Sequence, residues 1–235
     1  MIKTINVHAG HGADGSKSCG ATGLIKESTE ARKVKDLVIK LLKEEGLTVY
    51  DCTVDYPNDA KDCLNKIVSK CNAHKVDLDI SIHFNAGANK LADNATTGVE
   101  VLTYNSSSKA NPYAKEICAR ISKLGFKNRG VKHRTNLAVL KTNNPNLLIE
   151  CCFVDDPDDI KIYDHEKMAR AIVEGILGRD IEASKPAVNT PNNNNEEIYY
   201  RVVVGSYKSL ATANSEVEKA KAKGYSGAFV AKYVK

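Results

Sequence analysis

The stretch that most constrains the fold is residues 76–86, which read V-D-L-D-I-S-I-H-F-N-A. Its even-numbered residues from Leu78 to Phe84 are apolar and its odd-numbered residues are polar. This two-residue period is typical of a β-strand and not of a helix. His83 stands at the C-terminal end of the predicted strand. Because ligands of open α/β sheets bind beyond the carboxyl ends of the strands, His83 is a candidate site residue.

Two other strand-like runs also end in polar residues. Residues 2–7 lead into the sequence H-A-G-H-G, whose second histidine is His11, and residues 147–149 lead directly into Glu150. We expect the chain to turn sharply at His11, because the flanking glycines tolerate the backbone angles that such a turn needs. His11, His83 and Glu150 are therefore predicted to collect at one edge of the sheet.

Strand and helix patterns alternate along the first three quarters of the chain. One amphipathic helix begins at Glu27, and its apolar positions recur at helical spacing until Gly46 supplies a stop. This alternation predicts an α/β fold, a mostly parallel twisted sheet with helices on both faces. The predicted strands are 2–7, 47–50, 76–86, 98–104 and 147–149, and the predicted helices are 27–45, 64–71, 112–124 and 164–177.

The composition changes near residue 180. Residues 181–197 are rich in asparagine and proline and are read as a flexible linker between a first domain, 1–180, and a small C-terminal β-α-β module, 198–235. The module is predicted to contain a strand at 199–204, a helix at 209–223 and a second strand at 227–234. Residues 197–235 carry seven Lys/Arg against three Glu. This charge suggests a polyanionic or wall-like surface as partner, and a merely solvated basic face is the alternative.

Composition limits where the chain can act. No apolar run approaches the roughly 20 residues that span a bilayer, and the N-terminus shows no secretory signal. The seven cysteines are odd in number and include no C-x-x-C pair, so we read them as reduced thiols that mostly fill the core. We expect a soluble protein, synthesised in the cytoplasm without a signal peptide.

Two imidazoles and one carboxylate, those of His11, Glu27 and His83, form a donor set that suits zinc. Three protein ligands leave the fourth tetrahedral position open, as in catalytic sites. Bound zinc lowers the pKa of a water molecule to about 7, and a separate carboxylate must then move the proton. Glu150 is the candidate for that role. Taken singly, each residue also fits an ordinary role as a surface histidine or as a glutamate that complements a helix dipole.

Four ordered motifs carry a resemblance to a known family. They are H-A-G-H-G at 8–12, the segment 20–27 that ends in Glu27, S-I-H-F-N-A at 81–86, and L-I-E at 148–150 followed by Phe153. Over about residues 1–178 they resemble the motifs of the zinc-dependent N-acetylmuramoyl-L-alanine amidases of the type 3 family. That family usually has D-P-G-H where this chain has H-A-G-H, so His8 replaces the common aspartate.

The resemblance implies a peptidoglycan hydrolase. By it, His11, Glu27 and His83 hold zinc and Glu150 is the catalytic acid/base. The bond cut is the amide that joins the lactyl group of N-acetylmuramic acid to L-alanine of the stem peptide. We expect no nucleic-acid partner and no insertion into a membrane. Such an enzyme acts on the bacterial cell wall after the membrane is breached, as a phage endolysin or as a bacterial autolysin.

The tail resembles a second family. Y-R-V-V-V-G-S-Y at 200–207, with K-G-Y at 223–225, looks like one half of a SPOR domain, a peptidoglycan-binding module that normally contains two such halves. The 39 residues from 197 to 235 lie near the lower limit of about 40 residues for an independent core. We therefore expect a homodimer joined through the tail. A generic strand, helix, strand fragment without a binding role is the alternative.

Two other functions remain open. A zinc carboxypeptidase needs a cation to receive the terminal carboxylate of its substrate, and Arg129 or Arg134 can supply one. An inactive wall-binding protein is disfavoured, because binding alone does not need Glu150. The segment 132–134 is expected to be a basic loop. Three further histidines are expected at the surface without a metal role: His74, His133 and His165.

Overall fold

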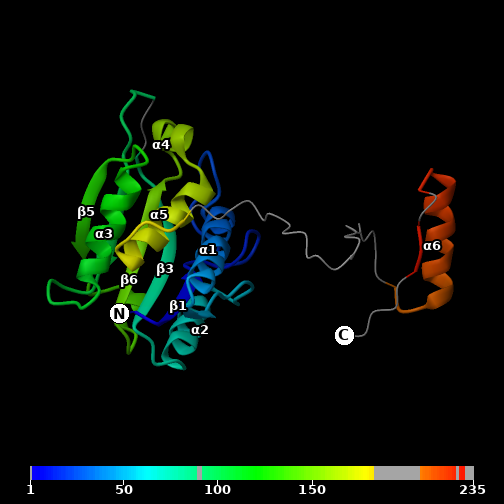
Figure 1. Ribbon diagram of the computed structural model, residues 1–235, viewed down its shortest axis with the longest axis horizontal. Coiled ribbons are helices and arrows are strands. Elements are labelled where there is room, and N and C mark those ends of the chain that lie inside the picture. Colours follow the sequence, from blue (N-terminus) through cyan, green and yellow to red (C-terminus); the bar gives the residue numbers. More distant parts are fainter. Residues whose placement is uncertain (1, 89–91, 183–206, 226–227, 231–235) are drawn as a thin grey trace. The chain divides into compact units, whose positions relative to one another are not determined.

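The computed structural model describes residues 2–88, 92–182, 207–225 and 228–230 (Figure 1). The chain divides into two compact units, Met1–Ser184 and Lys185–Lys235, and each is considered by itself. The first unit has the predicted α/β fold, with a mixed sheet between two layers of helices.

The sheet has six strands in the order β2-β1-β3-β6-β4-β5. Within the described residues, neighbouring strands pair in parallel except β4 and β6, which run antiparallel. The prediction of a mostly parallel sheet is therefore confirmed. The strands are β1 (Thr4–Ala9), β2 (Thr48–Asp51), β3 (Leu78–Asn85), β4 (Val99–Thr103), β5 (Asn128–His133) and β6 (Asn146–Phe153).

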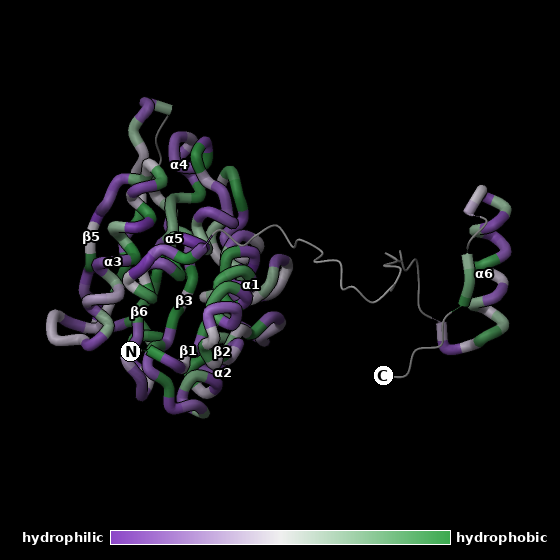
Figure 2. Tube along the Cα trace, in the orientation of Figure 1, coloured by the Kyte–Doolittle hydropathy of each residue, from purple (hydrophilic) through white to green (hydrophobic). Residues whose placement is uncertain are grey.

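Helices cover both faces of the sheet, as predicted. The even-numbered residues of β3, such as Ile80 and Ile82, pack into one core with residues of α1, α3 and α5. Leu148 and Leu102 face the other way and pack into a second core with α2 and η1. Figure 2 shows hydrophobic stretches, in green, on β3 in the interior and on α1. The helices are α1 (Glu27–Glu44), α2 (Ala60–Asn72), α3 (Asn111–Ser122), α4 (Pro157–Ile162) and α5 (His165–Leu177), with the short 3-10 helix η1 (Ala138–Lys141).

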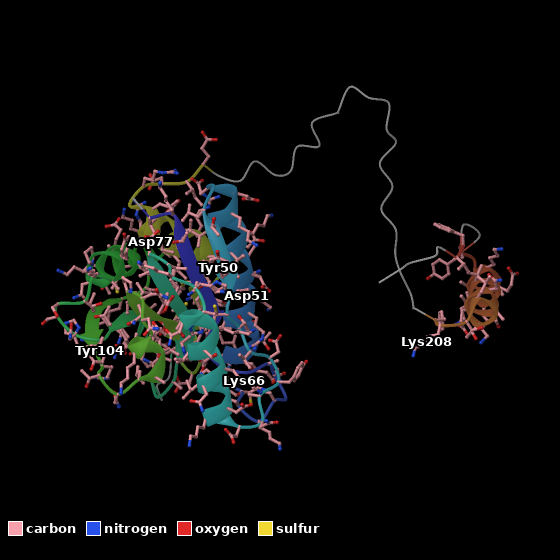
Figure 3. All side chains as sticks on the ribbon, turned by 90° about the horizontal axis from the view of Figure 1, so that it is seen from below. Tyr50, Asp51, Lys66, Asp77, Tyr104 and Lys208 are labelled. Carbon is pink, nitrogen blue, oxygen red and sulfur yellow. The ribbon has the colours of Figure 1, made fainter. Side chains whose placement is uncertain are left out.

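Asp77, labelled in Figure 3, aligns the start of β3 with the start of β1. Its carboxylate accepts hydrogen bonds from the backbone N–H groups of Lys3, at 2.8 Å, and Thr4, at 2.9 Å. Fixing the register matters because a shift of one residue would turn every side chain of the strand to the opposite face. This register places the His83 side chain on the opposite face of the sheet from the Ile82 side chain.

The cysteines behave as the sequence predicts. All seven are free thiols, six of them are buried, and only Cys19 is exposed. The buried ones contribute to the two apolar cores, in which a free cysteine packs as a small hydrophobic residue.

Two sequence-based expectations are wrong in detail. Residues 132 and 133 belong to β5 and are not part of a loop, because they pair with Leu102 and Thr103 of β4. Glu150 does not end its strand, since β6 continues through Cys151 and Cys152 to Phe153. Those residues are buried, which keeps the strand inside the sheet beyond the glutamate.

Aspartates at the start of α4 hold the connection between β3 and β4. Asp156 accepts a hydrogen bond from the backbone of Thr97 at 2.7 Å. Asp159 accepts one from Gly98 at 3.1 Å and another from Phe153 at 2.8 Å. These carboxylates accept hydrogen bonds from N–H groups of the connection and of Phe153 in β6, so they tie the connection to the end of β6.

The second unit is described around a single helix, α6 (Leu210–Ala222), whose N-terminus is capped by Ser209. The helix predicted at 209–223 is therefore confirmed. The strand predicted at 199–204 lies outside the described residues, and residues 228–230, within the other predicted strand, are not in a strand. Among the described helices, none is both long and apolar enough to cross a membrane.

We predict that Asp159→Ala destabilises the first unit by about 2 to 6 kcal/mol, because two buried N–H donors lose their acceptor at about 1 to 3 kcal/mol each. Chemical denaturation measures the change. Asp14→Ala is the matched control, since Asp14 makes only a half-exposed ion pair with Lys26, which is worth at most about 1 kcal/mol. Equal effects of the two substitutions would contradict the assigned role of Asp159.

Candidate metal centre

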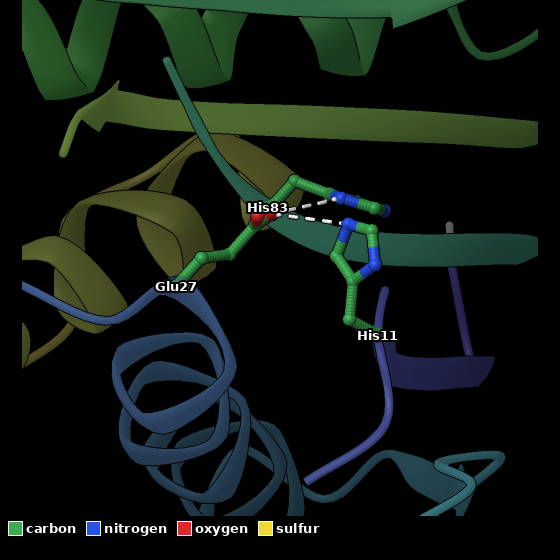
Figure 4. Close-up of side chains that lie close together, drawn as sticks. All are labelled: His11, Glu27 and His83. Carbon is green, nitrogen blue, oxygen red and sulfur yellow. Dashed lines mark hydrogen bonds and ion pairs between the residues drawn. The ribbon is translucent and has the colours of Figure 1, made fainter. Parts of the chain in front are cut away.

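The structure brings the four predicted site residues together at the C-terminal edge of β3, and Figure 4 shows three of them, His11, Glu27 and His83. His83 lies near the end of β3, and Glu150 of β6 is its direct neighbour in the sheet. Glu27 is the first residue of α1, as predicted. His11 follows the end of β1 by two residues. His11, Glu27 and His83 therefore lie at or near the end of a strand or helix, whereas Glu150 lies within a strand.

The Glu27 carboxylate is the centre of this cluster. Its Oε1 lies 3.1 Å from His83 Nδ1 and 3.5 Å from His11 Nε2. The same oxygen accepts a hydrogen bond from the backbone of Phe84 at 3.0 Å, and Oε2 accepts one from Ala21 at 2.7 Å. With a side chain only 4% exposed, Glu27 is held from several sides and cannot swing into solvent.

The three side chains shift one another's pKa. Burial alone would raise the pKa of Glu27, but the hydrogen bond and charge of His83, the charge of His11 and the Phe84 N–H together lower it. Burial opposes protonation of His83, yet its bond to Glu27 and the nearby Glu150 charge raise its pKa. Burial and the neighbouring His83 lower the pKa of His11. The cluster therefore favours an ionised carboxylate beside one neutral imidazole.

The donor atoms suit a metal ion. One atom from each of His11, Glu27 and His83 lies within 4.8 Å of the others, and the described residues hold no other such group. Glycines make the space: a Cβ on Gly10 would come within 1.8 Å of His83 Nε2, and one on Gly20 within 2.2 Å of Glu27 Oε2.

The glycine at position 10 is explained by the lack of room for a Cβ beside His83. From the sequence, a sharp turn was instead expected to require the flanking glycines. Gly10 and Gly12 do not adopt positive φ angles. The predicted reason was therefore wrong, although the predicted position of His11 beside His83 was correct.

Arg32 of α1 fixes the loop that carries His11. Its guanidinium donates hydrogen bonds to the backbone oxygens of His11 at 3.0 Å, Gly12 at 3.1 Å and Ser28 at 2.9 Å, and it pairs with Asp55. Sequence reasoning missed this residue, because a side chain that binds backbone carbonyls leaves no pattern of matching side chains. Through these hydrogen bonds, Arg32 fixes the position of His11 relative to α1.

Glu150 has the environment of a proton carrier. Burial raises its pKa to about 7, with the negative charges of Glu27 and Glu100 adding to the effect and the charge of His83 opposing it. Its Oε2 is buried and has no hydrogen-bond partner among the described residues. Glu100 of β4, which faces Glu150 across the sheet, is a second site residue that sequence reasoning missed. A charged residue amid the apolar run of residues 99–103 was the available signal.

The remaining histidines lie outside the cluster. His8 is buried, with Nδ1 3.2 Å from the Ala9 oxygen, and burial lowers its pKa to about 3. His133 is exposed, as expected, and contacts Thr103. His74 and His165 are only partly exposed, and the His74 ring stacks on Tyr50. None of the four contributes a donor atom to the His11, Glu27 and His83 group.

Comparison with known proteins identifies the family. Residues 5–178 match the family model described as N-acetylmuramoyl-L-alanine amidase. The chain belongs to this family. Residues 176–232 match the model of the SPOR domain.

Relatives of the amidase family agree with this assignment. An uncharacterized Clostridium perfringens protein is 36% identical over 76% of this chain, and the endolysin of Bacillus phage SPP1 is 30% identical over 74% of it. This chain spans 52% of the length of the first relative and 64% of the second. The catalytic domain of the CD27L endolysin, which targets Clostridia difficile, superposes with a TM-score of 0.67 at 27% identity, covering 76% of this chain and 99% of that domain.

Proposed function

We propose that this amidase-family chain is a zinc-dependent peptidoglycan hydrolase. It cuts the amide between the lactyl group of N-acetylmuramic acid and L-alanine of the stem peptide. The observation that carries the proposal is the position of Glu150, which is next to His83 in the sheet and has one buried oxygen without a partner among the described residues. A carboxylate free to exchange a proton beside a three-donor metal cluster is the arrangement that hydrolysis of an amide needs.

His11, Glu27 and His83 fit zinc. Two imidazoles and a carboxylate with donor atoms within 4.8 Å of one another match its preferred ligands, and the space left by Gly10 and Gly20 keeps them convergent. When bound, zinc lowers the pKa of a water molecule and polarises a carbonyl group. The backbone N–H groups of Phe84 and Ala21 keep Glu27 oriented toward the two histidines.

Glu150 moves the proton. Its carboxylate takes a proton from the water that attacks the amide carbon and returns it to the amide nitrogen as the carbon–nitrogen bond breaks. The products are a free lactyl carboxylate on the muramic acid and a free amino group on L-alanine. Burial, together with the charges of Glu27 and Glu100, raises the pKa of Glu150 to about 7, so both of its protonation states are accessible.

Residues 1–180 form the catalytic domain in this proposal, 181–197 the linker, and 198–235 a SPOR-like module that holds the enzyme on the wall. Such a protein reaches its substrate once the membrane is breached. The zinc carboxypeptidase alternative predicts different products. An amidase releases intact stem peptides and glycan strands from purified walls, whereas a carboxypeptidase releases single amino acids.

One prediction of the proposed function concerns metal content. His83→Ala removes one of three donors and should lose most of the zinc that the wild-type chain retains, at about one ion per chain, as measured by elemental analysis. His133→Ala is the matched surface control and His8→Ala tests the neighbouring buried histidine. Both should keep their zinc. Full occupancy in a folded His83→Ala protein, or loss in His8→Ala, would show that the wrong histidine was assigned.

Another prediction concerns the role of Glu150. Glu150→Gln keeps the shape of the side chain but cannot accept a proton, so wall hydrolysis should fall by about 10² to 10⁴ while zinc content and melting temperature stay near wild type. Release of stem peptides from purified walls measures the rate. Near-normal turnover would contradict the assigned role, and simultaneous loss of zinc would make Glu150 a ligand or a support of the metal site.

A further prediction concerns the formation of a homodimer. In the described part of the second unit, no residue of α6 is buried, and Tyr207, Leu210, Tyr225 and Phe229 are exposed. We propose that a second copy of the tail covers them with two-fold symmetry. Sedimentation at micromolar concentration should give a dimer for the full chain and a monomer for residues 1–180. A monomeric full chain would contradict the dimer.

A further inference from the structure

A row of polar side chains crosses the sheet from the metal cluster to its edge. His83 of β3 pairs with Glu150 of β6, and Glu150 pairs with Glu100 of β4. Directly paired residues of neighbouring strands point to the same face, so these side chains form one line. β5 adjoins β4, and Arg129 of β5 extends the line, because its Nε lies 2.8 Å from Glu100 Oε2.

Arg129 is held in a fixed orientation. Its Nε donates a hydrogen bond to the Glu100 carboxylate, and its guanidinium carbon lies 5.0 Å from the centre of the Phe153 ring. Asn85 Nδ2, 3.3 Å from Glu100 Oε1, steadies the carboxylate in turn. The arginine side chain is 32% exposed, and neither terminal nitrogen has a hydrogen-bond partner among the described residues. The Nη edge of the guanidinium is therefore available to a ligand.

The chemistry of this edge selects a carboxylate. A guanidinium presents two parallel N–H donors, which match the two oxygens of a carboxylate, and such charged pairs are about twice as strong as neutral hydrogen bonds. Holding the guanidinium against Glu100 and Phe153 removes much of the entropy that an unrestrained arginine would lose on binding. The neutral carbonyl of a carboxamide would receive the same donors more weakly.

The spacing indicates which part of the substrate arrives there. Three strand spacings of about 4.8 Å separate the backbone of His83 from that of Arg129, about 14 Å in all, and the arginine side chain reaches back toward Glu100. An extended peptide advances about 3.3 to 3.6 Å per residue. A stem peptide whose first amide lies at the metal cluster thus brings its second residue within reach of Arg129.

We propose that Arg129, held by Glu100, binds a free carboxylate on the second residue of the stem peptide and so makes the enzyme select for that charge. The assignment rests on the proposed amidase function and adds a specificity-determining residue to it. Arg129 acts on binding of substrate, whereas Glu150 acts on proton transfer.

Two synthetic N-acetylmuramoyl-L-alanyl-D-glutamyl substrates test the proposal, one with a free α-carboxylate on the second residue and one with an α-carboxamide there. The full-length wild-type chain should favour the carboxylate by about tenfold in kcat/KM, mainly through KM. Arg129→Gln should keep its zinc and should use the two substrates with nearly equal kcat/KM. Arg134→Gln, at an exposed position just beyond β5, is the matched control and should keep the preference.

Each other outcome is decisive. Retention of the preference by Arg129→Gln, or equal use of both substrates by the wild type, would overturn the role of Arg129 and leave the amidase function standing. If Arg129→Gln does not fold, Arg129→Lys decides, because a point charge without the two-donor edge should reduce the preference, and an unchanged preference would overturn the proposal. No release from either substrate or from purified walls would overturn the amidase function, and this assignment with it.

Discussion

The Glu27 carboxylate is the contact on which the site depends. Its two oxygens join the first residue of α1 to the loop before it, through Ala21, and to the end of β3, through Phe84 and His83. Hydrogen bonds to an ionised acceptor are stronger than neutral ones, and here they are shielded from water. The same group therefore links the start of α1 to the end of β3 and lies beside both imidazoles.

The second constraint is a line of charged side chains across the sheet. Glu150 and Glu100 are adjacent carboxylates on one face, and isolated charges of that kind are expensive to bury. His83 at one end of the line and Arg129 at the other carry or can carry the opposing charge. Burial raises the pKa of Glu150, and the charge of His83 opposes this only in part. Burial also acts on Glu27, but the hydrogen bond and charge of His83, the charge of His11 and the Phe84 N–H together lower its pKa. In the proposed function, this difference gives Glu27 the role of a metal ligand and Glu150 that of the proton carrier.

The sequence predicted the parts of the fold that hydrophobic periodicity controls. The strand ending near His83 and the helix beginning at Glu27 were found within one or two residues, because their apolar positions repeat at the period of the element. β5 was missed because it is a polar edge strand held by its ladder to β4, and α4 because its buried residues include Asp158 and Asp159. The His11, Glu27 and His83 cluster was predictable from strand ends and family motifs. The Arg32 contacts to backbone oxygens were not, since every residue type offers a carbonyl.

The single exposed cysteine has a practical consequence. Burial raises the pKa of Cys118 to about 11 and those of Cys151 and Cys152 well above their usual value, so these thiols stay protonated inside the core. Cys19 lies at the surface, one residue before the Gly20 that packs against Glu27. A thiol-directed fluorescent or spin label on the unmodified chain would therefore attach at one place. From there it would report, in real time, how the loop beside the metal cluster responds when an ion or a fragment of the wall arrives.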